Sequence, residues 1–153
     1  MAKRTVSGLD ELKQLAGEEI GTSEWVEITQ ESVNKFAEAT GDHQWIHVDP
    51  EMAKKHSPFG GPVAHGFLTI SLSPLLQAEV MAVDGVKMGV NYGLNKLRFP
   101  SPVLVGKRVR MHMSIKEVTD VEGGAQVTSL LTFEVEGQEK PACVAESIAR
   151  YYF

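Results

Sequence analysis

Cysteine is nearly absent from this sequence, and its scarcity excludes several kinds of site. Cys143 is the only cysteine among the 153 residues, so an intramolecular disulfide and a CxxC metal or redox motif are both excluded. Chains without disulfides are typical of reducing compartments, and we therefore expect a cytoplasmic setting.

An excess of positive charge and a long apolar segment are also missing. The net charge is −5, and the basic residues are scattered along the chain. We therefore expect no nucleic-acid partner, although a local group of cations is compatible with an anionic ligand. No apolar h-region follows Lys3 and Arg4, and no segment supplies the roughly 20 apolar residues of a membrane helix. A soluble, untargeted chain is expected.

The composition, 42% hydrophobic and 23% charged, is typical of one globular domain, which we expect to span residues 1–153. Apolar spacing and capping residues predict the following local elements. They are helices over 9–16, over 30–40 after an N-cap at Thr29, and over 50–56 after an N-cap at Asp49, with a short strand over 25–29. A segment without charge before Glu79 predicts a buried helix over 67–83, kinked or interrupted at Pro74.

From residue 86 onward the apolar pattern changes to a period of two. It predicts four long strands, over 86–99, 108–118, 126–135 and 142–152. Consecutive strands joined by short turns favour an antiparallel sheet, and small side chains at Cys143, Ala145, Ser147 and Ala149 leave room for the uncharged helix. The expected fold class is α+β, a curved antiparallel sheet wrapped around a long central helix.

The motif GDHQWIH over residues 41–47 places an acid and two histidines in a predicted loop after a helix that ends at Gly41. Asp42 and His47 are able to hold one water, with the histidine as a second proton carrier. Two alternatives stay open: an Asx turn at Asp42 with a structural His47, or a metal bound by His43 and His47. No third ligand is evident, so no metal is expected, and His43 is expected to face solvent.

A second loop, GGPVAHG, contributes Gly60, Gly61, Pro62, His65 and Gly66 as candidate substrate contacts. Glycine permits close backbone approach, and free amides at the start of the buried helix favour an oxyanion on a thioester. Alternatively, the glycines only turn the chain, and His65 holds the loop in place without taking part in the reaction.

The stretches ATGDHQWIHVDPEMA and GGPVAHGFLTISL resemble the MaoC-like hydratases, the (R)-specific enoyl-CoA hydratase group. GDHQWIHVDP, NYGLNKLRFP and KPACVAESIARY most resemble its NodN-like branch. The similarity extends from Trp25 to the C-terminus. It implies a hot-dog fold, usually as a homodimer, that adds water syn to a trans-2-enoyl-CoA to form the (3R)-3-hydroxyacyl-CoA, without a cofactor. It also implies that Asp42 and His47 are catalytic and that Gly66 supplies the oxyanion donor.

One departure from the family pattern concerns the turn itself. Gln44 and Trp45 stand where the family usually has Asn-Pro, so the restraint of a proline is lost and the acyl-length preference is open. Trp45 either lines an acyl pocket or belongs to the core or a dimer interface.

Further candidates for contacts with the substrate, coenzyme A or an acyl-carrier-protein thioester, lie mainly in NYGLNKLRF. Lys96 and Arg98, with Lys54 and Lys55 as weaker candidates, are able to bind phosphates, and Asn91, Tyr92 and Asn95 either contact the ligand or a second subunit. Two rival functions are a hot-dog thioesterase, whose acid usually lies on the central helix, and a non-catalytic acyl-thioester binding module.

Overall fold

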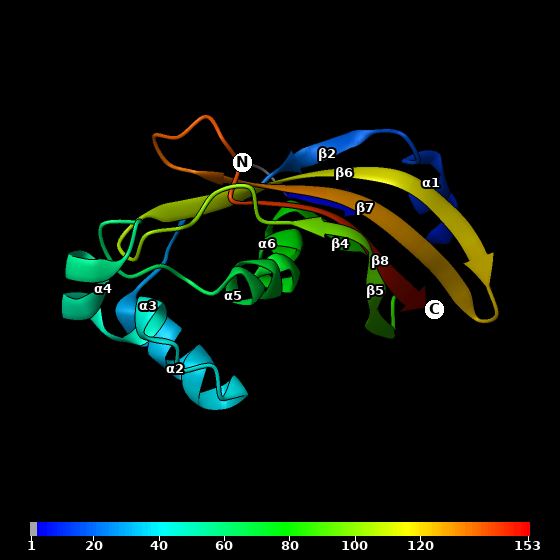
Figure 1. Cartoon of the computed structure of the whole chain (residues 1–153). Helices are drawn as coiled ribbons and strands as arrows, with labels where there is room; N and C mark the ends of the chain where they lie inside the picture. Colours follow the sequence, from blue (N-terminus) through cyan, green and yellow to red (C-terminus); the bar gives the residue numbers. More distant parts are fainter. Residues whose placement is uncertain (1–2) are drawn as a thin grey trace.

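The computed structural model describes residues 3–153. The helices are α1 (Leu9–Gln14), α2 (Gln30–Thr40), α3 (Trp45–Val48), α4 (Pro50–His56), α5 (Gly66–Ser71) and α6 (Ser73–Val80). The strands are β1 (Arg4–Val6), β2 (Glu19–Thr22), β3 (Val26–Glu27), β4 (Met81–Val83), β5 (Met88–Arg98), β6 (Arg108–Val121), β7 (Gly124–Val135) and β8 (Cys143–Tyr152). One large curved sheet bends around α5 and α6, as expected (Figure 1).

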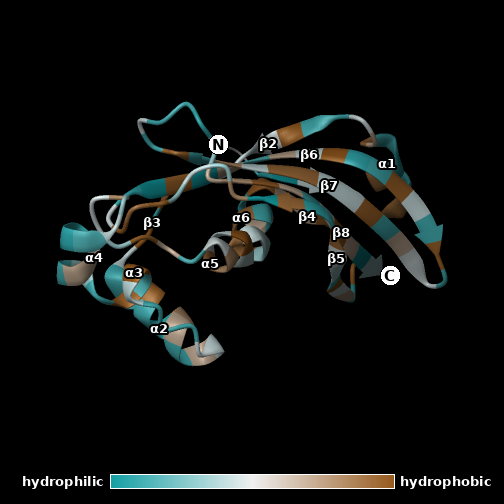
Figure 2. Ribbon diagram, viewed as in Figure 1, coloured by the Kyte–Doolittle hydropathy of each residue, from teal (hydrophilic) through white to brown (hydrophobic). Residues whose placement is uncertain are grey.

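The large sheet is antiparallel, with the strand order β2-β6-β7-β8-β5, and β3 also pairs with β6. The four long predicted strands are confirmed within a few residues at each end. Along β6 apolar and polar residues alternate, and the apolar set is buried: Val109, Met111, Met113 and Ile115. Figure 2 shows this alternation as changing colours along the strands. One face of the sheet therefore covers the core, while the other carries charged pairs.

The central helix is interrupted, because α5 ends at Ser71 and α6 begins at Ser73 with Pro74 in its first turn. Proline fits the first turn of a helix but lacks the amide needed to continue one, so a break here was expected. The prediction that the helix reaches residue 83 is wrong. Met81 is already extended, and β4 pairs in parallel with β1 in a separate two-stranded sheet. Two short helices therefore replace the single long one.

The core joins α6 to the inner face of the sheet. Leu76 and Val80 of α6 pack in one cluster with Met111, Cys143 and Ala145. Of the four predicted small residues of β8, Cys143 and Ala145 pack in this cluster, whereas Ser147 and Ala149 line a hollow beside α6. This packing sets the position of α5, which precedes α6 and carries the second candidate motif.

The predicted helix caps near the first motif are confirmed. Thr29 Oγ1 accepts a hydrogen bond from the Ser32 amide at the start of α2, and Asp49 accepts one from the Met52 amide at the start of α4. Gly41 ends α2 with φ 85°. Helices α2, α3 and α4 gather at one end of the molecule, near the start of α5 (Figure 1).

The described residues contain no helix with the length and apolar character to cross a membrane. β5 forms one edge of the large sheet and is exposed along nearly its whole length.

Candidate active site

The Asp42 turn is held by local hydrogen bonds. Asp42 Oδ1 accepts a hydrogen bond of 3.3 Å from the Gln44 amide, which is the Asx-type arrangement considered from the sequence. The chain then forms α3, so the expectation of a loop over residues 41–47 is wrong for its last three residues. The His47 amide donates to the Gln44 carbonyl at 3.0 Å. This single helical turn brings His47 back toward Asp42.

His47 is buried, with 7% of its surface exposed. Its Nδ1 lies 2.6 Å from the Val63 carbonyl oxygen, which only accepts, so Nδ1 carries the proton of the neutral ring. Nε2 is then free to accept, and it lies 4.0 Å from Asp42 Oδ2. Two acceptors that share one water through bonds of about 2.8 Å lie roughly 4 to 4.5 Å apart. The gap between Asp42 and His47 therefore matches one bridging water.

His65 joins this pair from the start of α5, and the sequence predicted it as a substrate contact, with support of the loop as the alternative. Its ring stacks on the His47 ring, with centroids 3.8 Å apart and an interplanar angle of 23°. Its Nε2 donates to the Asp42 backbone carbonyl at 3.0 Å, so Nδ1 is the unprotonated nitrogen of the neutral ring. That Nδ1 is buried and has no partner in the described part of the chain. His65 thus contacts both members of the pair.

Gly66 is the first residue of α5, and its amide donates no hydrogen bond within residues 3–153. Because α5 has only six residues, the local N–H group supplies more of the polarity here than a helix dipole does. A Cβ at Gly66 would lie 2.7 Å from the Phe99 ring. Glycine is therefore needed at this position for packing, and the same absence of a side chain leaves the amide accessible.

The rest of the GGPVAHG loop is built by backbone conformation. Gly60 adopts φ +79°, which other residues rarely adopt, whereas Gly61 makes an ordinary contact with Leu104. The Pro62 carbonyl accepts a hydrogen bond from the Val105 amide. These three residues support the loop, and the part of GGPVAHG that contacts residues 42–47 is Val63 and His65, with Gly66 next in the chain.

Three potential metal ligands meet at this site, because single ligand atoms of Asp42, His47 and His65 all lie within 4.8 Å of one another. His43, the partner considered from sequence spacing, is exposed and is not in this group. A metal ion bound by the three would take His65 Nε2 away from the Asp42 carbonyl. This hydrogen bond of 3.0 Å would have to break for the three residues to bind one ion.

The remaining candidates lie along β5, in α3 and in α4. Trp45 is half-buried in α3, and Lys54 and Lys55 are exposed in the last turn of α4. The ring of Tyr92 lies 3.8 Å from the Arg150 guanidinium carbon. The pKa of Glu146 is lowered mainly by its hydrogen bond with Lys116, then by a hydrogen bond from Asn95, and least by the nearby charge of Lys96.

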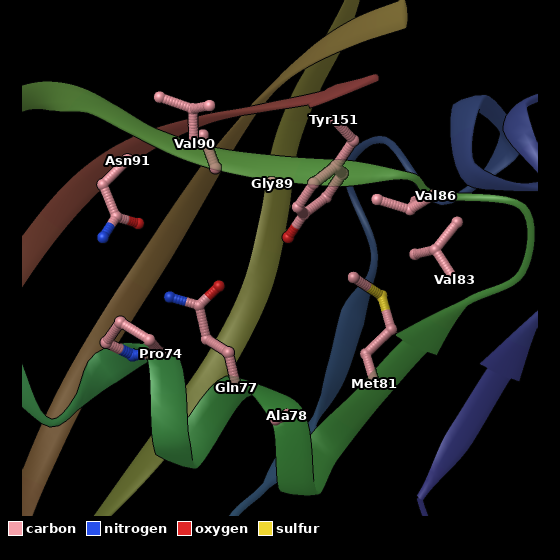
Figure 3. Close-up of a pocket in the computed structure, with 11 residues that line it drawn as sticks. Pro74, Gln77, Ala78, Met81, Val83, Val86, Gly89, Val90, Asn91 and Tyr151 are labelled. Carbon is pink, nitrogen blue, oxygen red and sulfur yellow. The ribbon is translucent and has the colours of Figure 1, made fainter. Parts of the chain in front are cut away.

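Arg98 is exposed and donates to its own neighbour, the Leu97 carbonyl. It precedes Phe99, whose ring lies against Gly66, so the end of β5 adjoins the site. Asn91 lies farther along β5, where it faces α6 (Figure 3). Arg98 and Asn91, both predicted substrate contacts on β5, therefore lie in different regions, Arg98 near Gly66 and Asn91 beside α6.

Sequence reasoning missed two supports of His47. The Val63 carbonyl orients its ring, and Gln30 Nε2 donates to its backbone carbonyl at 2.8 Å. A backbone acceptor leaves no signal in residue types, and Gln30 looks like any first-turn helix residue. Both contacts depend on segments that are 16 and 17 residues away.

The sequence was compared with models of known protein families. The model described as MaoC like domain matches residues 11–136. The chain belongs to this family. This confirms the resemblance read from the two motifs.

Named relatives extend over almost the whole chain. It is 58% identical over 149 residues to 3-hydroxyacyl-thioester dehydratase Z of Mycobacterium tuberculosis, covering 97% of this chain and 98% of that protein. It is 42% identical over 143 residues to Nodulation protein N of Rhizobium meliloti, covering 92% and 89%. The NodN-like branch is therefore supported.

Solved structures share the fold. The (R)-hydratase from A. caviae involved in PHA biosynthesis is 25% identical, with a TM-score of 0.67, covering 87% of this chain and 96% of that chain. The antiparallel sheet and its helices are those of the hot-dog fold that the resemblance implied.

Proposed function

We propose that this MaoC-like protein is an (R)-specific enoyl-thioester hydratase, which also catalyses the reverse dehydration of (3R)-3-hydroxyacyl thioesters. The observation that carries the proposal is the 4.0 Å gap between Asp42 Oδ2 and His47 Nε2, and Gly66 begins α5 directly after His65, which contacts both residues. The dehydratase and hydratase names of its relatives support the same reaction class.

The hydrogen-bond pattern gives each residue of the pair a role. With Nδ1–H bound to Val63, neutral His47 presents a lone pair at Nε2, and ionised Asp42 presents carboxylate oxygens. A water between them donates one proton to each, which leaves its oxygen lone pairs free to attack. Asp42 acts mainly as the base that takes a proton as the oxygen bonds to C3.

The reaction is completed when a proton from the pair reaches C2. The oxygen and this proton come from the same side of the double bond, so addition is syn. Gly66 N–H donates to the thioester oxygen as negative charge develops on it. We assign His65 a positioning role, since it donates to the Asp42 carbonyl and stacks on the His47 ring.

The thioester carrier is coenzyme A or an acyl-carrier protein, and both present phosphate. Arg98 is the better placed of the predicted cations, because it is exposed beside Phe99 at the Gly66 end of β5. Lys96 lies near the Glu146 carboxylate, whose ion pair is with Lys116. Arg98 is therefore our first choice for a phosphate contact.

We also infer a homodimer joined through β5. This edge strand has 11 residues and leaves backbone groups on one side without a strand partner in the described chain. Long exposed edges favour pairing with another strand. Large exposed apolar residues lie on it and on α5 and α6: Phe67, Leu75, Met88, Val90, Tyr92 and Leu94. A second copy that pairs β5 with β5 covers many of them.

The reaction is tested by following the loss of enoyl absorbance with crotonyl-CoA, together with chiral analysis of the product. We expect the (3R)-hydroxyacyl thioester from the wild type, and a loss of about 10²- to 10⁴-fold in kcat for Asp42→Asn and for His47→Ala. Asp84→Asn and His56→Ala change exposed residues of the same types and serve as controls.

Two results count against the proposal. Retained activity in folded Asp42→Asn and His47→Ala removes the pair from the mechanism. Release of free thiol in place of hydration supports the thioesterase. That rival needs an acid on the central helix, where Glu79 instead accepts a hydrogen bond from the Glu24 amide.

A further inference from the structure

A groove runs between α6 and the strands β5 and β8. It consists of two adjoining hollows of about 360 and 400 Å³, which share Pro74, Gln77, Asn91 and Ala149 in their walls. These volumes are within the range of small-ligand sites. One hollow extends toward Ile70 and Ser71 at the end of α5, and the other toward Met81 and Val83.

The walls of the groove combine apolar residues with polar ones, among them Gln77, Asn91 and Tyr151. Figure 3 shows the Gln77 amide between the Asn91 amide and the Tyr151 hydroxyl, with the polar ends of all three facing the same space. Within residues 3–153 the structure shows no side-chain hydrogen bond between protein groups for any of these three, of which Asn91 is exposed and Gln77 and Tyr151 are half-buried. Burial raises the pKa of Tyr151, in agreement with a hydroxyl that lies among apolar neighbours.

The packing around Tyr151 leaves space for these groups. A Cβ at Gly89 would lie 3.4 Å from the Tyr151 ring, so glycine lets the ring lie flat against β5. Ala78 and Ala149 also line this hollow, and their small side chains leave its volume open. Polar groups that line an apolar site without protein partners are the usual means by which a site orients a ligand.

We propose that the groove binds the distal part of the acyl chain and that Gln77, Asn91 and Tyr151 recognise a hydroxyl or carbonyl group carried on it. This inference rests on the hydratase function. An amide both donates and accepts, so Gln77 suits either group. The preferred substrate class is a long enoyl thioester with an oxygen substituent well beyond C3.

The position of Gln77 sets the length of this chain. It follows Gly66 by 11 residues, and one continuous helix would span about 16 Å over this distance, which is an upper limit because the helix is interrupted between α5 and α6. The four carbons of a crotonyl group are too short to reach it. Crotonyl-CoA therefore reports the reaction at Asp42 and His47, and long substrates report the groove.

The experiment compares kcat/KM for trans-2-dodecenoyl-CoA with that for analogues hydroxylated at successive carbons from C6 to C12. Wild type is expected to favour one position about 10-fold over the unsubstituted chain, as for one or two neutral hydrogen bonds. Gln77→Leu should reduce this ratio to about 1, and Tyr151→Phe by about 3-fold. Gln138→Leu in an exposed turn and Tyr152→Phe on the same strand are the matched controls, in which the ratio persists.

The outcomes separate the two proposals. Turnover of crotonyl-CoA with no preference for any hydroxylated chain overturns the groove assignment and leaves the hydratase intact. An unchanged ratio in Gln77→Leu also overturns it. If Gln77→Leu leaves the kcat/KM ratio unchanged but weakens the dimer, the Gln77 side-chain amide belongs to a subunit contact instead. Absence of turnover with both crotonyl-CoA and trans-2-dodecenoyl-CoA refutes the hydratase, and the groove assignment is lost with it.

Discussion

Replacement of His65 tests whether the second histidine aligns the catalytic pair. His65→Leu removes the donor to the Asp42 carbonyl and the ring that stacks on His47. His65→Gln keeps a donor near the position of Nε2 but removes the ring. The two variants therefore separate the hydrogen bond from the stacking contact.

The magnitude follows from these two contacts. A neutral hydrogen bond contributes ~0.5–1.5 kcal/mol, and a stacked ring pair a further ~0.5–1.5 kcal/mol. Their joint loss in His65→Leu is ~2 kcal/mol, which corresponds to a fall in Tm of about 4–8 °C for a chain of this size. A displacement of Asp42 by about 1 Å is expected to lower kcat about 100-fold.

The assay measures kcat, KM and Tm for both variants with crotonyl-CoA. We expect His65→Leu to lower kcat with little change in KM, and His65→Gln to recover at least half of that loss on a logarithmic scale. A folded His65→Leu with wild-type kcat refutes the positioning role. Equal losses in the two variants show that the hydrogen bond to Asp42 is not the important contact.

Three further predictions concern stability and reactivity. Gly124→Ala should destabilise the protein by about 3 kcal/mol or more, measured by urea unfolding, because its Cβ would lie 1.9 Å from the Tyr151 carbonyl oxygen. Burial raises the pKa of Cys143 to about 12, so iodoacetamide at pH 8 should label it only after denaturation. A hydrogen bond from Arg110, and secondarily one from His112, lowers the pKa of Glu134. The stabilising effect of Glu134 is therefore fully present above the ordinary glutamate pKa of 4.5 and is lost as the pH falls through the lowered pKa. Glu134→Gln should cost ~0.5–1 kcal/mol at pH 7 and nothing below that lowered pKa.

Controls for these predictions come from the same chain. Gly61→Ala places its Cβ 3.5 Å from Leu104, an ordinary contact, and should change stability much less than Gly124→Ala. Glu139→Gln alters an exposed acid for which the structure records no ion pair. Rapid labelling of Cys143 in the folded protein, or a Glu134→Gln difference that persists at low pH, contradicts the corresponding argument.

Local elements of the fold were predictable because their causes are local. Thr29, Gly41 and Asp49 act within one helical turn, and their capping roles are confirmed. The short strands β1, β2 and β4 were missed, since each has three or four residues and exists through its partner strand. The helix end at Val80 was missed for the same reason, because pairing with β1 recruits the residues after it.

The candidate site was predictable where residue types carry the chemistry. The spacing of Asp42 and His47 drew attention to a water-holding pair, and the resemblance gave it a reaction. The roles of His65 and Val63 depend on distances across 16 to 23 residues, which no local pattern encodes. Likewise, the positions of α5 and α6 decide that Asn91 adjoins the α6 groove while Arg98 lies near Gly66.

By itself the sequence determined the family, the α+β class and the residues able to move a proton. Only the tertiary structure decided the His47 tautomer, the stacking of His65 and the shape of the α6 groove. The physical reason is that side-chain chemistry belongs to each residue, whereas hydrogen-bond partners and cavities arise when α5, α6 and the sheet pack together.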